Sequence, residues 1–203
     1  NCFSMIDFRL SLLQSIASNN SRTAFVVCGK SYSYRELGVE IVAVQRYILS
    51  LGDATKRIGV LCDDSLTTYA AVLSIMLLDK TFIPILRHYP NERNGEIIRL
   101  AQIDCVIDFN DVVLDRQDDK SIEIVPTTGN PLAILFTSGS TGKPKGVPYN
   151  AININATLDA YLKLGMDLGV DDRFLQMFDL NFDMSYLSFM PALLIGASVF
   201  TVG

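Results

Sequence analysis

The chain has 203 residues, of which 49% are hydrophobic and 19% are charged, so it has enough apolar side chains for a packed core and lacks the composition of a disordered protein. The net charge is −5 and the sequence contains no basic block, which argues against a nucleic acid polymer as partner. The longest mostly apolar stretches, residues 69–78 and 192–200, are too short to cross a membrane. The 4 cysteines are scattered without C-x-x-C spacing, which argues against a metal site or a disulfide framework and favours the cytoplasm.

The first quarter of the chain predicts two helices and a hairpin. An amphipathic helix covers residues 8–16, and the short apolar runs 24–27 and 31–34 predict the two strands of a hairpin. Ser33 and Glu36 have the spacing of a capping box, and apolar residues then recur at helical intervals. We therefore expect a helix over residues 34–51.

Strands and helices alternate through the rest of the chain. We expect strands at residues 57–62, 82–86, 105–109, 132–136 and 198–202, and helices at residues 65–78, 91–101, 151–164 and 183–195. This alternation predicts an α/β fold with layered, mostly parallel β-sheets flanked by helices. The length favours one large domain or a part of a larger one.

Residues 137–146 form the most unusual segment, TSGSTGKPKG, between a predicted strand and a predicted helix. Glycines let main-chain N–H groups face a ligand, hydroxyls add donors, and lysines add charge, so the segment is typical of a phosphate-binding loop at the start of a helix. The alternative is a flexible surface turn of the same composition. The residues that we expect to bind the phosphates of ATP are Thr137, Ser138, Gly139, Ser140, Thr141, Gly142 and Lys145.

The loop differs from two common nucleotide motifs, because Pro144 follows Gly142-Lys143 where a Walker A loop needs Ser or Thr, and no G-x-G-x-x-G occurs. It closely resembles the signature loop of the adenylate-forming enzymes, which include acyl-CoA synthetases, luciferases and the adenylation domains of non-ribosomal peptide synthesis. Further resemblances follow in family order at residues 32–37, 79–85, 181–185 and 194–197. The resemblance covers about residues 30–203.

In the amino-acid-activating members, the Asp of the "FDxS" motif pairs with the α-ammonium group of the substrate, a role that maps onto Asp183. By the same mapping, Met184 and Leu187 would line the pocket for the substrate side chain. Taken alone, Asp183 could instead be a helix N-cap, and the two apolar residues could be ordinary core. The style of the motif resembles the ligases that load D-alanine onto a carrier protein.

The resemblance implies a two-step reaction. A substrate carboxylate attacks the α-phosphorus of ATP, with Mg²⁺ present, to give an acyl adenylate and pyrophosphate, and the phosphopantetheine thiol of a carrier protein then displaces AMP. The expected substrate is an amino acid or another small carboxylic acid. By this resemblance, residue 203 would precede the family's ribose-binding aspartate, its hinge and its C-terminal catalytic lysine. Residues 1–203 are therefore expected to be the N-terminal portion of the large AMP-binding domain. We assign no catalytic residue among them and expect them to be inactive alone.

Two other functions remain open. The chain could belong to an acyl-CoA-type synthetase whose substrate has no amine, in which case replacing Asp183 would matter little. It could also be a nucleotide-binding relative without catalysis.

Overall fold

The computed structural model describes residues 6–117, 121–138 and 143–202. The helices are α1 (Phe8–Ser18), α2 (Tyr34–Ser50), α3 (Leu66–Leu77), α4 (Asn91–Ala101), α5 (Ala151–Leu162) and α6 (Asp183–Ile195), with a short 3₁₀ turn at Phe109–Asp111. The strands are β1 (Thr23–Val27), β2 (Lys30–Ser33), β3 (Arg57–Cys62), β4 (Thr81–Leu86), β5 (Cys105–Ile107), β6 (Pro131–Ser138), β7 (Pro144–Asn150), β8 (Arg173–Gln176) and β9 (Ser198–Thr201).

The strands form two sheets, in the orders β2-β1-β9-β8 and β5-β3-β4-β6-β7. The pairs β1–β2 and β6–β7 are antiparallel, and the other described pairs are parallel. The prediction of layered, mostly parallel sheets flanked by helices is confirmed. In each sheet the antiparallel partner is an edge strand, which a short connection can supply without a crossover helix.

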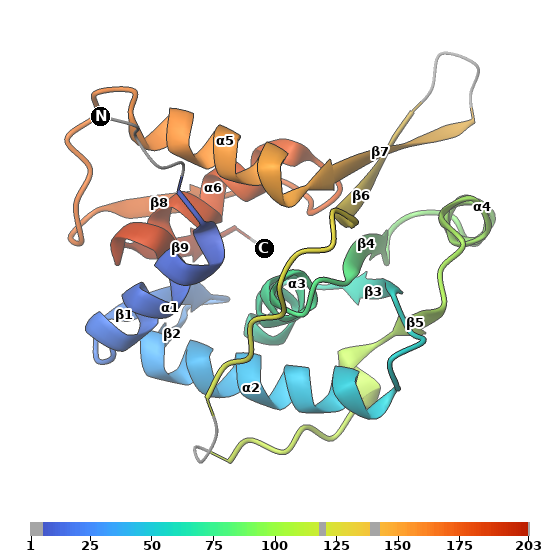
Figure 1. The fold of residues 1–203 in the computed structure, drawn as a ribbon, viewed down its shortest axis with the longest axis horizontal. Coiled ribbons are helices and arrows are strands. Elements are labelled where there is room, and N and C mark those ends of the chain that lie inside the picture. The colour runs from blue at the N-terminus through green and yellow to red at the C-terminus, as the bar shows by residue number, and fades with distance from the viewer. Residues whose placement is uncertain (1–5, 118–120, 139–142, 203) are drawn as a thin grey trace.

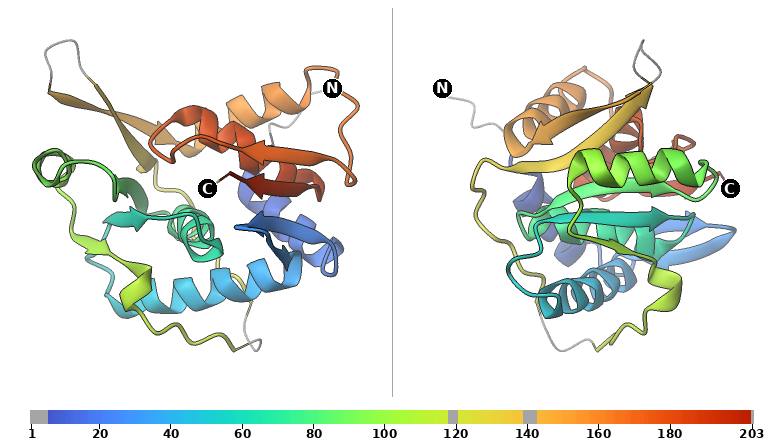
Figure 2. Two further views of the ribbon diagram at one scale, coloured as in Figure 1. Left: turned by 180° about the vertical axis from the view of Figure 1, so that it is seen from behind. Right: turned by 90° about the vertical axis from the view of Figure 1, so that its right-hand side faces the viewer.

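Helix α3 lies between the two sheets (Figure 1). Almost all of its residues are buried, as expected for a helix that is apolar on every face. The ring of Tyr69 on α3 stacks on Phe25 of β1 at a centroid distance of 4.8 Å and meets Phe189 of α6 edge-on. Every residue of β4 is buried, because α3 covers one face of its sheet and α4 covers the other (Figure 2).

The capping box of α2 is present as predicted. The Ser33 side chain accepts a hydrogen bond from the backbone N–H of Glu36, and the Glu36 carboxylate accepts one from the backbone N–H of Ser33. Helix α2 begins directly after this cap, at Tyr34. The hydroxyl of Tyr34 donates a hydrogen bond to the carbonyl of Ala197, near β9, at 2.6 Å. A local signal and a long-range contact therefore specify the same helix start.

Two strands were not among the sequence expectations. Strand β8 has only 4 residues, and strand β7 contains Pro144, Gly146 and Pro148, which are unfavourable inside a sheet. Strand β7 tolerates them because it is an edge strand paired only with β6 in the described sheet. The glycine-rich segment therefore connects two antiparallel strands, and its expected place at the start of a helix is wrong.

Candidate functional site

Strands β6 and β7 form a hairpin that extends from the body of the molecule (Figure 1). Thr137 and Lys145 lie directly opposite each other in it, and both are exposed. Directly paired residues share one face of a sheet, so a hydroxyl donor and an ammonium group lie side by side there. This pair fits an anionic ligand such as a phosphate.

The remaining loop predictions fall largely outside the described residues. Gly139, Ser140, Thr141 and Gly142 lie outside them, and of Ser138 only the backbone is described, as the last residue of β6. Among the described residues of the hairpin, Thr137 and Lys145 are therefore the groups suited to bind an anion, and they lie on strands rather than at the predicted helix N-terminus.

Gly146 shows why this strand needs a residue without a side chain. A Cβ atom at this position would lie 3.0 Å from side-chain carbons of both Ile134 and Phe136, closer than almost all real contacts. Phe136 belongs to the small apolar cluster beneath α4. The glycine thus lets β7 pack closely against this cluster.

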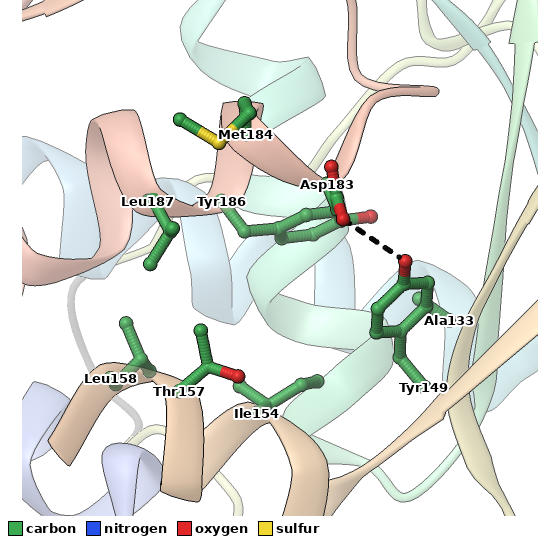
Figure 3. Close-up of a pocket in the computed structure, with 9 residues that line it drawn as sticks. All are labelled: Ala133, Tyr149, Ile154, Thr157, Leu158, Asp183, Met184, Tyr186 and Leu187. Carbon is green, nitrogen blue, oxygen red and sulfur yellow. Dashed lines mark hydrogen bonds between the residues drawn. The ribbon is translucent and has the colours of Figure 1, made fainter. Parts of the chain in front are cut away.

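A cavity of about 100 Å³ lies beside the hairpin, between α5 and α6 (Figure 3). Most of its lining is apolar, and its polar groups are an aspartate, a threonine and two tyrosines. The lining residues are Ala133, Tyr149, Ile154, Thr157, Leu158, Asp183, Met184, Tyr186 and Leu187. The three residues predicted for substrate binding, Asp183, Met184 and Leu187, are therefore together in one cavity wall.

Asp183 is the first residue of α6 rather than its N-cap, which is Phe182. Its Oδ2 atom accepts a hydrogen bond from the hydroxyl of Tyr149 on β7, at 3.3 Å. A carboxylate is favoured at this position because a helix N-terminus carries partial positive charge. The side chain of Asp183 thus contacts the neighbouring strand at the polar end of the cavity (Figure 3).

The two tyrosines of the cavity were missed by sequence reasoning. Burial, together with the charge of Asp183, raises the pKa of Tyr149, so its hydroxyl stays protonated and can donate to that carboxylate. Burial raises the pKa of Tyr186 well above its usual value, and its hydroxyl oxygen is buried without a hydrogen-bond partner among the described residues. Tyr149 could have been found from the period-two spacing of Lys145, Val147 and Tyr149, which is typical of a strand.

Strand β7 connects the two parts of the site. Lys145 and Tyr149 are four residues apart on it, so they lie on the same face, separated by about 13 Å at the usual rise of a strand. One face of a single strand thus carries a group suited to phosphate near the hairpin tip and a group that contacts Asp183 at the cavity.

The described residues contain neither a membrane-spanning helix nor a cluster of metal-ligating side chains. No helix among them is long and apolar enough to cross a membrane. No group of three or more His, Cys, Asp or Glu side chains in residues 6–117, 121–138 and 143–202 is arranged to hold a metal ion.

Comparisons with known proteins agree with the architecture. The chain is 27% identical over 199 residues to bacitracin synthase 3 of Bacillus licheniformis, a match that covers 88% of this chain and 3% of that protein. The fold matches that of the Vibrio cholerae adenylation domain AlmE, solved in complex with glycyl-adenosine-5'-phosphate, with a TM-score of 0.86 and 21% identity over 100% of this chain and 46% of that one.

The Klebsiella oxytoca NpsA N-terminal subdomain, solved in complex with 3-hydroxyanthranilyl-AMSN, also matches, with a TM-score of 0.78 and 21% identity over 96% of this chain and 52% of that one. The chain thus spans only part of the relatives it matches. The sequence model of the family described as AMP-binding enzyme matches residues 12–203. The chain belongs to this family, the adenylate-forming enzymes that its glycine-rich loop and "FDxS" motif resemble.

Proposed function

We propose that the chain forms the part of an adenylate-forming ligase that binds the substrate amino acid and the phosphates of ATP. The observation that carries the proposal is the carboxylate of Asp183 at the polar end of a mostly apolar cavity. A carboxylate there favours a substrate with an ammonium group through a charge-assisted hydrogen bond, while the apolar walls of Leu158 and Leu187 suit an uncharged side chain.

In the proposed reaction, a carboxylate oxygen of the amino acid forms a bond to the α-phosphorus of ATP. The bond from that phosphorus to the oxygen bridging to the β-phosphate breaks, and pyrophosphate leaves. Both partners are anions, so the reaction needs fixed donors near the phosphates. Lys145 and Thr137 supply an ammonium group and a hydroxyl there, and Mg²⁺, when bound with ATP, would neutralise further negative charge.

The geometry supports two binding regions at different positions along β7, one for the amine of the substrate and one for the phosphates. Tyr149 and Asp183 would hold the amine end of the substrate, and Lys145, about 13 Å away along the strand, would hold the outgoing phosphates. In the second step we propose that the phosphopantetheine thiol of a carrier protein attacks the acyl adenylate and releases AMP. The resemblance to amino-acid-activating ligases supports this step.

The proposal extends to the place of the chain in its enzyme. We propose that these residues correspond to the N-terminal portion of the large AMP-binding domain, which the match to 46% of the AlmE chain supports. The 203 residues alone are then expected to be inactive in amino-acid-dependent ATP–pyrophosphate exchange, because the ribose-binding aspartate and catalytic lysine expected from the family lie outside them. Sustained exchange by the purified chain would contradict this expectation.

Nucleotide binding tests the phosphate part of the proposal directly. We expect the Lys145→Ala variant to bind Mg·ATP about tenfold more weakly than the unaltered chain in calorimetric titrations at low salt, since a charged hydrogen bond to phosphate is lost. A Lys30→Ala variant, which removes an exposed lysine from β2, serves as the control and should bind normally. Equal affinity of both variants for Mg·ATP would refute the assignment of Lys145.

A further inference from the structure

We propose that the side chains of Asn181 and Tyr89 form a latch that positions Asp183 for its contact with the substrate. The latch is the hydrogen bond that Asn181 Nδ2 donates to the Tyr89 hydroxyl oxygen at 2.7 Å, between residues 92 positions apart in the chain. Neither residue lines the cavity, so both act through Asp183. The inference rests on the proposed function and adds two positioning residues to it.

The latch connects the two sheets at the ends of two strands. Tyr89 lies in the turn after β4, and Asn181 lies in the segment that joins β8 to α6. These strands belong to different sheets. A second contact runs beside the latch, where His88 Nε2 lies 3.5 Å from Asp179 Oδ2, but both of these side chains are well exposed and such contacts contribute little. The hydrogen bond to the buried Asn181 is therefore the stronger of the two contacts.

The start of α6 depends on this segment because it has no side-chain cap of its own. The N-cap residue, Phe182, makes no side-chain capping bond. Of residues 177–182, only Leu180 and Asn181 are buried. The apolar packing of Leu180 has no preferred direction, whereas the hydrogen bond of Asn181 does. Asn181 therefore restricts how the chain approaches Asp183, two residues later.

Tyr89 is a fixed acceptor for this hydrogen bond. The guanidinium carbon of Arg93 lies 4.2 Å from the centroid of its half-buried ring, and the ring of His88 meets it edge-on at a centroid distance of 5.0 Å. These contacts hold the ring in one orientation. The phenol oxygen is thus in place before Asn181 meets it.

Asn181 contributes little to the stability of the fold. Its Nδ2 atom has a partner, but its Oδ1 atom is buried and has no hydrogen-bond partner among the described residues. An unpaired buried oxygen costs about as much as one hydrogen bond gains, and an apolar residue would avoid this cost. The orientation that Asn181 imposes therefore explains an asparagine at this position better than stability does.

The contact that depends on this orientation is the hydrogen bond between Asp183 and Tyr149. At 3.3 Å it is long, so a small displacement of the first turn of α6 would break it. The exposed carboxylate of Asp183 could then turn towards solvent and away from the cavity. Loss of the latch should therefore weaken recognition of an amine while leaving the rest of the site intact.

The experiment measures binding of two stable adenylate mimics to the full 203-residue chain by calorimetric titration. One is alanyl-sulfamoyladenosine, and the other is its propionyl counterpart, which lacks only the amine. We expect the unaltered chain to prefer the alanyl mimic by at least about 100-fold. Tyr89→Phe and Asn181→Leu should each reduce this preference about three- to tenfold, since each removes the latch. The double variant should lose no more than either single variant, because all three lack the same contact.

Urea unfolding of the double variant separates positioning from a merely structural role. Both partners of the hydrogen bond are then replaced by apolar groups of similar size, a change that is nearly neutral for stability. We therefore expect an unchanged or higher urea midpoint together with the reduced preference. Tyr47→Phe is the matched control, because this tyrosine lies on α2, where its ring packs edge-on against Phe109, and it should change neither quantity.

Two results would overturn the latch. One is an unchanged preference in both single variants. The other is an equal loss of affinity for both mimics, because the contact would then support the site as a whole rather than Asp183. Equal binding of both mimics by the unaltered chain would refute amine recognition and the latch with it, whereas binding of neither would refute the proposed function itself.

Discussion

Replacing Tyr186 by phenylalanine should stabilise the folded chain. The phenol oxygen of Tyr186 is buried and has no hydrogen-bond partner among the described residues, so the folded state bears the cost of removing it from water. Such a cost is about 1–3 kcal/mol, and phenylalanine removes it while keeping the aromatic ring in place. For a domain of this size, each 1 kcal/mol raises Tm by roughly 2–4 °C.

Tyr34 provides the matched comparison, because the same substitution there should have the opposite sign. Tyr34 is also buried, but its hydroxyl donates to the carbonyl of Ala197 at 2.6 Å. Tyr34→Phe removes this donor and leaves a buried carbonyl with one partner fewer, which should cost about 1–3 kcal/mol.

Thermal and urea unfolding followed by circular dichroism would measure both effects. We expect the free energy of unfolding to rise in Tyr186→Phe and to fall in Tyr34→Phe. If Tyr186→Phe lowers the stability as much as Tyr34→Phe does, the Tyr186 hydroxyl has a partner in the folded chain.

Two further predictions concern single positions in the fold. Gly196→Ala should destabilise the chain by about 1 kcal/mol or more, because Gly196 ends α6 with φ +83° and a Cβ there would lie 2.5 Å from the side-chain amide of Asn19. Gly95 lies in α4, where an added Cβ would meet no atom within 4 Å. Gly95→Ala should therefore stabilise the chain by about 0.5–1 kcal/mol. Chemical unfolding of the two variants checks this, and a loss at both positions would contradict it. The backbone N–H groups of Arg57 and Lys56 donate to the carboxylate of Asp104 and lower its pKa in the folded state. The ionised carboxylate therefore stabilises the folded state fully at pH values above its unfolded pKa of about 4. This contribution is lost as the pH falls through the lower pKa of the folded state. The stability difference between the unaltered chain and Asp104→Asn should therefore be largest near neutral pH and shrink below about pH 4, and a pH-independent difference in urea titrations would argue against the assigned cause.

Elements with strong local signals were predictable from the sequence. Helix α2 begins at Tyr34 as expected, because its capping box and apolar spacing involve residues close together in the chain. Strand β7 was missed because Pro144, Gly146 and Pro148 are unfavourable in a sheet in general, and only its edge position makes them acceptable. Whether a strand lies at an edge depends on pairing with distant residues, which local pattern does not contain.

Some residues of the candidate site were likewise predictable from the sequence, and others were not. Asp183, Met184 and Leu187 were expected from a motif of adjacent residues, and the structure brings them into one cavity lining. Tyr149 was missed because it meets Asp183 across 34 positions of sequence. Tyr186 is three residues beyond Asp183, yet its unsatisfied hydroxyl becomes apparent only from the packing around it.

The sequence by itself determined the layered α/β class, most of the helices and the family resemblance, because these depend on short-range periodicity and on consecutive motif residues. Only the tertiary structure decided that the glycine-rich segment joins two antiparallel strands, and that a tyrosine on the second of them contacts the aspartate at the start of α6. The physical reason is that strand pairing and cavity walls are made by residues far apart in the chain. Their contacts are selected by the burial of the whole core rather than by any local preference.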